Sequence, residues 1–151
     1  MGTNFEFQLH VRKQTWIDLL RKEMSKYDPE DVWFVTLAPG RQVSDETIEK
    51  NGKSWLFRLY DANRNRNGDE GKDIRSFGVI SRQQRGVLHP HLLIAGKGLR
   101  YLNKGDWEFR WRKLAGPGSS CKILEANKNA PAYMLNKRNF TGDNIVAEPF
   151  L

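Results

Sequence analysis

The sequence has few of the residues that build cross-linked or membrane-embedded proteins. Its single cysteine, Cys121, cannot form an internal disulfide and lacks the partner cysteines of a zinc ribbon, so we interpret it as a small core residue. No apolar run approaches the roughly 20 residues that a membrane-spanning helix needs, and no signal-peptide core follows the first residues. We therefore expect a cytoplasmic protein that makes no contact with a membrane.

Acidic residues are the minority among the charges, at 18 against 25 basic ones, which gives a net charge of +7 and a pI near 9.7. This balance favours a polyanionic partner, because basic groups release counterions when they bind one. Five Trp and eight Phe could stack on unpaired bases, although a basic surface over ordinary core aromatics fits the same counts. The 151 residues, 38% of them hydrophobic, fit one globular domain over 1–151.

The hydrophobic patterns predict strands and helices that together make an α+β chain. Strands are expected at Val32–Ala38, Ile74–Gln84, Val87–Ala95, Trp107–Arg112 and Cys121–Glu125. Helices are expected from Thr15 to a stop at Asp28-Pro29, from an N-cap at Ser44 to about Tyr60, and over Asn129–Arg138. The tail over 139–151 is expected to be irregular.

Two segments leave alternatives open. Asn51-Gly52 interrupts the pattern of the second helix and could split it in two. The polar run from Asn63 to Asp73 is typical of a mobile loop, but it also fits a solvated hairpin connection. A basic finger for DNA is the third interpretation of this run, and it depends on Arg64 and Arg66 alone.

Two of the three histidines lie in one short segment, His89-Pro90-His91. In a strand they project from the same face with their imidazoles adjacent, and two neutral imidazoles make half of a metal site. Two partly buried strand histidines bonded to backbone groups are the alternative. Pro90 cannot donate to a sheet ladder, so the strand either lies at an edge there or leaves that position unpaired. A turn at Arg85-Gly86 would pair this strand with the preceding one and bring Ser81 and Gln83 near the histidines.

A tyrosine stands near the start of the last expected helix. Asn129 can cap that helix and Pro131 suits its first turn, so Tyr133 would lie near the positive end of the dipole. Lys137 follows one turn later on the same face, where it could hold a phosphate or ease deprotonation of the phenol. Beside paired histidines and a basic surface, these residues suit attack of tyrosine on a phosphodiester. A core tyrosine and a solvated lysine are the alternative.

These segments resemble the motifs of a known family. Arg85-Gly86-Val87-Leu88-His89-Pro90-His91-Leu92 resembles the histidine–hydrophobic–histidine motif of HUH endonucleases, and Tyr133 with Lys137 resembles their tyrosine motif. Gln83-Gln84-Arg85-Gly86 before the histidines is similar to rolling-circle replication initiators of bacterial plasmids and phages, and Val32–Ala38 matches their first-strand motif. The likeness spans roughly residues 32 to 138, in the family's motif order.

The resemblance implies a ferredoxin- or RRM-like HUH endonuclease fold, a central antiparallel sheet of about five strands flanked by helices. It also implies a site-specific nickase that acts on single-stranded or hairpin DNA at a replication origin. Mg²⁺ or Mn²⁺ would bind His89 and His91. Many relatives carry Glu where this sequence has Ser81, so Gln83 is the expected third ligand.

By the same resemblance, Tyr133 would attack the phosphate, form a 5′-phosphotyrosine and leave a free 3′-OH, with Lys137 assisting. Further DNA contacts are expected from basic and aromatic residues: Arg85, Arg64, Arg66, Trp107, Arg110 and Arg138. The chain has no helicase domain, so a host helicase and polymerase are the expected partners of what we take to be a monomer.

Two other functions fit the same sequence. A catalytically silent, RRM-like module could bind single-stranded nucleic acid or an origin, with Trp107, Phe109 and Trp111 for base stacking. A histidine-based metallohydrolase would instead cleave with activated water and form no covalent adduct.

Overall fold

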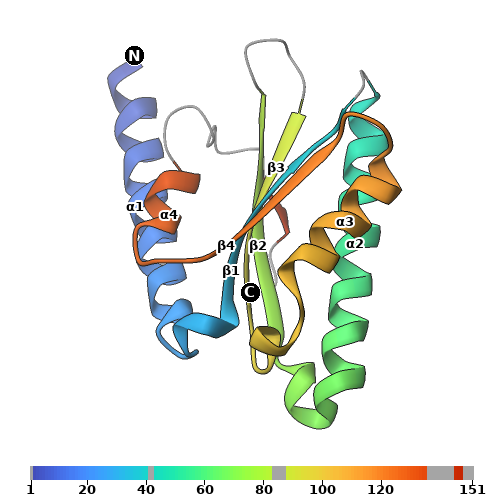
Figure 1. Cartoon of the computed structure of the whole chain (residues 1–151). Helices are drawn as coiled ribbons and strands as arrows, with labels where there is room; N and C mark the ends of the chain where they lie inside the picture. The colour runs from blue at the N-terminus through green and yellow to red at the C-terminus, as the bar shows by residue number, and fades with distance from the viewer. Residues whose placement is uncertain (1, 41–42, 83–87, 136–144, 148–151) are drawn as a thin grey trace.

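The structure is a computed structural model that describes residues 2–40, 43–82, 88–135 and 145–147 (Figure 1). The four helices are α1 (Gly2–Met24), α2 (Asp45–Asn67), α3 (Lys104–Ala115) and α4 (Ala130–Met134). The strands are β1 (Val32–Ala38), β2 (Ile74–Arg82), β3 (Leu88–Gly96), β4 (Ser120–Glu125) and the short β5 (Ile145–Ala147). Three short 3₁₀ turns are η1 (Pro29–Asp31), η2 (Gly68–Lys72) and η3 (Leu99–Tyr101).

The strands form one antiparallel sheet in the order β4-β1-β3-β2-β5. The first four strands make its body, and three residues of β5 pair with β2 at the edge. The expected α+β class, with an antiparallel sheet flanked by helices, is therefore confirmed. The expectation of an irregular tail was wrong for 145–147, and the rest of 139–151 lies outside the described residues.

Each face of the sheet carries its own helical layer (Figure 1). On one side α1 and α4 cover a core that includes Leu20, Leu93 and Met134. On the other side α2 and α3 cover a second core that includes Trp33, Trp55 and Trp111. The strand predicted at 32–38 is confirmed as β1, and its burial on both faces explains why its sequence is almost continuously apolar.

The strand predicted at Trp107–Arg112 was wrong, because this segment is the middle of α3. Six residues of alternating aromatic and charged side chains also fit a helix, since Trp107 and Trp111 are one turn apart and share a face. Both are buried, at 4% and 0% exposure, whereas Phe109 on the outer side is 56% exposed. Asn103 caps the helix by accepting a hydrogen bond from the Asp106 amide.

Helix α2 runs unbroken through Asn51-Gly52 and beyond the expected end at Tyr60. Ser44 caps it as predicted, since its hydroxyl accepts a hydrogen bond from the Thr47 amide. Gly52 does not split the helix, and buried apolar residues lie on both sides of it, Ile48 before it and Trp55 after it. The first helix also exceeds its prediction, since α1 begins at Gly2.

The polar run at 63–73 is neither a loop, a hairpin connection nor a finger, because it forms the end of α2 and the turn η2. Asn63 is fully buried, and its side-chain amide donates to the carbonyls of Gly71 and Lys97, both at 3.1 Å. A Cβ at Gly71 would lie 2.2 Å from the Asn63 carbonyl oxygen, so only glycine fits this approach. Polar residues here close a turn and are not a solvated segment. Among the described helices, none is long and apolar enough to cross a membrane.

Candidate active site

His89 and His91 lie on β3, which pairs antiparallel with β2. In this register His89 faces Ser81 and His91 faces Val79, so the expected neighbourhood of the Ser81 strand and the histidines is present. Residues two apart on a strand share a face. Leu93 and Ala95 continue the same alternation and belong to the core beneath α1 and α4. The histidines therefore belong to the face of the sheet that carries α1 and α4.

The sheet opens where the histidines lie. The pairing of β1 with β3 runs from Val32/Ala95 to Thr36/His91, whereas β1 continues with β4 as far as Ala38. Beyond His91, β2 and β3 rise together while β1 and β4 lean toward α2 and α3 (Figure 1). Pro90 falls in the part of β3 that pairs with β2 alone. Of the two alternatives for Pro90, the edge position is the one observed, because β3 has no β1 partner at this residue.

His91 is held by two side chains of β1. Its ring stacks on Phe34 with the ring centroids 6.2 Å apart, and its Nδ1 lies 3.4 Å from Thr36 Oγ1. The tautomer of His91 decides whether its Nδ1 donates or accepts this hydrogen bond. If Nδ1–H donates to Thr36, the other nitrogen, Nε2, presents its lone pair, which is the form that binds a metal. Thr36 is thus the residue that can set the tautomer.

Burial makes both imidazoles poor bases. Burial, with a smaller contribution from the nearby His89, lowers the pKa of His91 to about 4. Burial also lowers the pKa of His89, which is the more exposed of the pair. Both rings are therefore neutral at pH 7, the state that a metal ligand requires. Within the described residues no group of three His, Cys, Asp or Glu gathers around them, so two nitrogens are the ligands that this part of the chain offers.

Tyr133 reaches the same face from α4. Its ring meets Phe34 edge to face, with centroids 5.8 Å apart and an interplanar angle of 85°. The side chain is 58% exposed although it touches this ring. Phe34 therefore contacts both His91 and Tyr133, and three segments that are distant in the sequence meet around one aromatic ring.

Helix α4 is shorter than predicted. It spans five residues, so Tyr133 lies in its last turn and not near the positive end of a long helix. The Asn129 side chain caps no amide among the described residues, and the Leu135 amide closes the helix on Pro131 and Tyr133 carbonyls. Pro131 does lie in the first turn, as expected. A dipole argument for activating the phenol is therefore weak here, since the effect grows with aligned peptide units.

Lys122 is a cation on this face that the sequence did not single out. It lies opposite Thr36 on β4, while its neighbours Cys121 and Ile123 turn into the core beneath α2 and α3. Its side chain is exposed. Because neighbouring strands are about 4.8 Å apart, the long lysine side chain starts about two strand spacings from His91.

Four predicted site residues lie outside the described residues: Gln83, Arg85, Lys137 and Arg138. Four others lie in the helical layer on the opposite face, away from the histidines: Arg64 and Arg66 on α2, and Trp107 and Arg110 on α3. Arg64 pairs with Asp61 at 2.6 Å, and Arg66 lies over the Tyr101 ring.

The two predicted contacts on α3 are also remote from the histidines. Trp107 is 4% exposed and packs edge to face on Trp55, so its predicted role in base stacking was wrong. Arg110 projects from the same helix with its guanidinium over the Trp107 ring. Alternation in a strand would have placed Trp107 and Arg110 on opposite faces, whereas in the helix the Arg110 guanidinium lies over the Trp107 ring.

The comparisons with known proteins add no relative. A scan against protein-family models matches none to this chain, and a search of curated proteins finds no significant match.

Proposed function

We propose that the chain is a metal-dependent, site-specific endonuclease that nicks and rejoins single-stranded DNA through a 5′-phosphotyrosine on Tyr133. The observation that carries this proposal is the continuous contact from His91 through Phe34 to Tyr133 on one face of the sheet. A nucleophile and two neutral imidazoles on one surface are what phosphodiester transfer to tyrosine needs. An HUH-type, ferredoxin- or RRM-like fold is part of the same proposal.

The tyrosine would act as the nucleophile. Its phenol loses a proton to solvent and the phenolate oxygen forms a bond to phosphorus. The bond from phosphorus to the 3′ oxygen breaks, and this oxygen takes up a proton from solvent to leave as a 3′-OH. Because the phosphotyrosine keeps the energy of the broken bond, the 3′-OH can later attack it and restore the strand. The 58% exposure of Tyr133 leaves room for a strand to approach the ring.

A metal ion on the two imidazoles, together with Lys122, would offset the negative charge of the phosphate. Mg²⁺ or Mn²⁺ on His89 and His91 would polarise the scissile phosphate when bound. Thr36 keeps the His91 ring oriented, and the exposed Lys122 adds a positive charge on the same face. In a cell, such a nickase would initiate rolling-circle replication at an origin, with a host helicase and polymerase as partners.

The decisive experiment is a search for the covalent adduct. The protein is incubated with Mn²⁺ and labelled hairpin oligonucleotides, and a denaturing gel is examined for DNA that migrates with the protein. We expect an adduct that Tyr133→Phe abolishes. Tyr101→Phe is the matched control, because Tyr101 is 61% exposed, close to the 58% of Tyr133, but lies on η3, which follows the end of β3 opposite to the histidines.

Three results would count against the proposal. Cleavage without an adduct would favour the metallohydrolase, in which water is the nucleophile. Binding without cleavage would favour the silent module. Equal loss of the adduct in Tyr133→Phe and Tyr101→Phe would show that neither tyrosine is specifically the nucleophile.

A further inference from the structure

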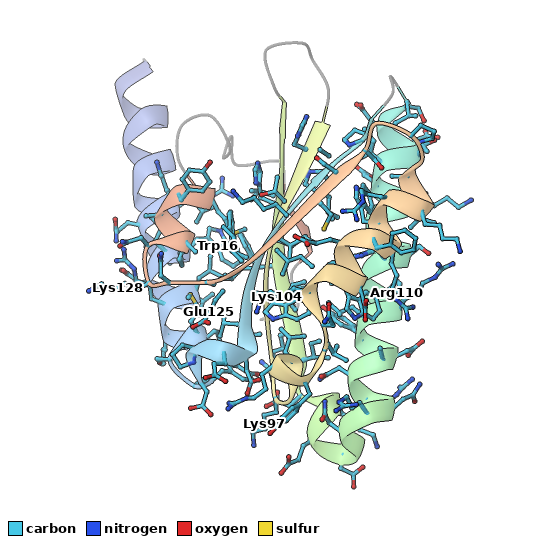
Figure 2. All side chains as sticks on the ribbon, viewed as in Figure 1. Trp16, Lys97, Lys104, Arg110, Glu125 and Lys128 are labelled. Atoms are coloured by element: carbon cyan, nitrogen blue, oxygen red, sulfur yellow. The ribbon has the colours of Figure 1, made fainter. Side chains whose placement is uncertain are left out.

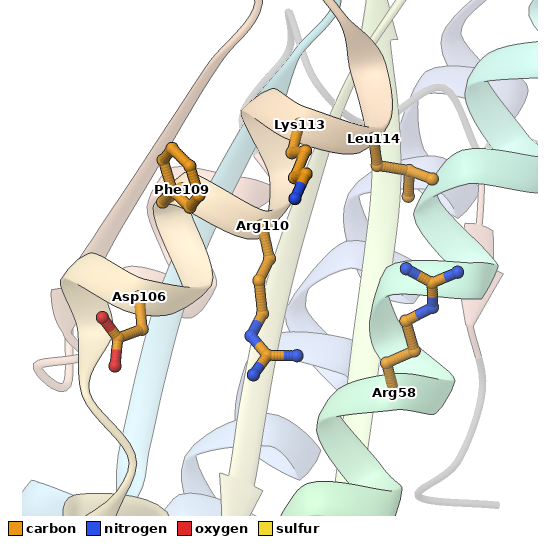
Figure 3. Close-up of a pocket in the computed structure, with 6 residues that line it drawn as sticks. All are labelled: Arg58, Asp106, Phe109, Arg110, Lys113 and Leu114. Carbon is orange, nitrogen blue, oxygen red and sulfur yellow. The ribbon is translucent and has the colours of Figure 1, made fainter.

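A second basic surface lies on the opposite side of the sheet from the histidines. Helices α2 and α3 enclose a pocket of about 550 Å³, lined by Arg58, Asp106, Phe109, Arg110, Lys113 and Leu114 (Figure 3). Trp16 on α1 and Arg110 on α3 mark the two opposite sides of the molecule in Figure 2. The volume falls in the range of roughly 300–1,000 Å³ that is usual for ligand pockets.

Positive charge predominates in the lining of the pocket, which has three cationic side chains and one acidic one. Arg58 comes from α2, and Arg110 and Lys113 lie three residues apart on α3, so that all three line the same space (Figure 3). Asp106 is the one acidic group of the lining. Within the described part of the chain, none of the three cations makes a hydrogen bond or an ion pair. Like charges gathered in this way repel one another, a cost that an anionic ligand removes.

The side chain of Arg110 is already oriented for a ligand. Its guanidinium carbon lies 4.6 Å from the centroid of the Trp107 ring, which is itself fixed in the core against Trp55. A guanidinium that stacks by its face on an aromatic ring keeps its N–H groups in its own plane, directed outward from the stack. Those N–H groups are the ones that bind phosphate oxygens, so the stacking orients the arginine without consuming its donors.

An aromatic ring stands beside the cations. Phe109 lines the pocket, is 56% exposed and has Arg112 above its ring at 5.9 Å. A free phosphate or an acidic peptide has no special need of an exposed phenyl ring. Unpaired nucleotides do, because the backbone phosphates take the cations while a base stacks on the ring.

We propose that this pocket is a second contact for single-stranded DNA, separate from the site around His91 and Tyr133. Phosphates of the strand bind Arg58, Arg110 and Lys113, and one base stacks on Phe109. The inference shares the nucleic-acid partner of the proposed nickase but does not depend on its chemistry. A pocket on the opposite helical layer would hold the strand at a distance from the reacting phosphate.

The test measures binding without cleavage. A fluorescent oligothymidylate is titrated with the full chain carrying Tyr133→Phe, in EDTA, and anisotropy is followed over a range of salt. Changing Arg58, Arg110 and Lys113 to Gln should weaken binding roughly ten- to a hundredfold near 0.1 M salt. The slope of log K against log salt should become shallower by about 2, since each lost phosphate contact removes about 0.7.

The matched control removes three positive charges elsewhere. Lys72, Arg75 and Lys97 are exposed and lie outside the pocket, so changing them to Gln lowers the net charge by the same amount. We expect their triple variant to retain most of the affinity. Circular dichroism melting of both variants shows whether each is folded at the temperature of the titration.

Stacking is tested by a single change. Phe109→Ala should weaken binding of the oligothymidylate about fivefold or more, and should leave an abasic strand of equal length unaffected. Equal loss in the two triple variants would overturn the proposed site, because general charge would then explain binding. An unchanged affinity of Phe109→Ala would overturn the assignment to a base-bearing strand.

The adduct assay keeps the two proposals distinguishable. If the pocket variant with Tyr133 intact still forms the adduct at the normal rate on a short hairpin, the nickase stands whatever the outcome at the pocket. If the unmodified chain never forms an adduct, but the pocket variant binds the oligothymidylate more weakly than the charge control does, the result supports the pocket and not the nickase.

Discussion

Phe34 is the residue whose replacement tests the geometry of the candidate active site most directly. It is partly buried and contacts both His91 and Tyr133. Phe34→Leu keeps most of the apolar volume, so it should cost less than about 1.5 kcal/mol in packing, plus part of the roughly 0.5–1.5 kcal/mol of each aromatic contact. A chain of this size should stay folded at 25 °C, since domains typically have about 5–15 kcal/mol of stability.

The expected effect on chemistry is larger than the effect on stability. Without the ring, Tyr133 and His91 lose their common support, and a displacement of about 1 Å at a reacting group can cost on the order of a hundredfold in rate. We therefore expect adduct formation by Phe34→Leu to be roughly 10- to 100-fold slower than by the unmodified chain. The measurement is the initial rate of adduct formation on denaturing gels, beside urea unfolding of each variant.

Phe77→Leu is the matched control. Phe77 is fully buried in the same core, and its ring contacts that of Trp16, with the ring centroids 4.9 Å apart. Its replacement should destabilise the protein at least as much and leave the adduct rate nearly unchanged at 25 °C. If Phe77→Leu slows the reaction as much as Phe34→Leu does, stability explains the loss and the positioning argument is refuted.

Two further predictions concern the fold itself. Burial, with a contribution from Glu108, raises the pKa of the Cys121 thiol to about 12, so alkylation by iodoacetamide at pH 8 should be on the order of a thousandfold slower in native protein than in urea. Mass spectrometry would contradict this if the two rates agreed within tenfold. Burial by itself would raise the pKa of Asp31. The hydrogen bonds from Arg100 and the positive charge of its guanidinium have the larger effect, so the pKa of Asp31 lies below the ordinary 3.8. This stabilisation is complete above the ordinary value and is lost as pH falls through the folded-state pKa, so Asp31→Asn should lower urea stability clearly at pH 7 and much less near pH 2. An equal loss at both pH values would refute the role of the ion pair.

Strands with strong local signals were predictable from the sequence. Val32–Ala38 is apolar and β-branched because β1 is covered on both faces, so the expected bounds and the observed bounds agree. The segment at 107–112 failed because two turns of helix are too short for a period of 3.6 to be told from a period of 2. The Asn103 cap lies just before the window and was the signal that could have identified the helix.

The supporting residues of the candidate site were not predictable in the same way. The histidine pair needs only the alternation along one strand, which is a local property. Phe34, Thr36 and Lys122 reach the histidines only through the registers that pair β1 with β3 and with β4. Those registers depend on contacts between segments that are distant in the sequence, and local patterns carry no information on them.

The opening of the sheet gives a physical reason for the position of the candidate site. A central strand normally has both edges paired, which leaves no place for a proline and little room for a ligand between neighbouring strands. Here the pairing of β3 with β1 stops at His91, so Pro90 is tolerated and His89 lies beyond the last β1 partner. The same divergence leaves Thr36, the last β1 residue paired with β3, as the hydrogen-bond partner of His91. The divergence of the two strands therefore leaves His91 buried beside β1 and His89 partly exposed beyond it, so that under the proposed function a phosphate would reach the pair at His89.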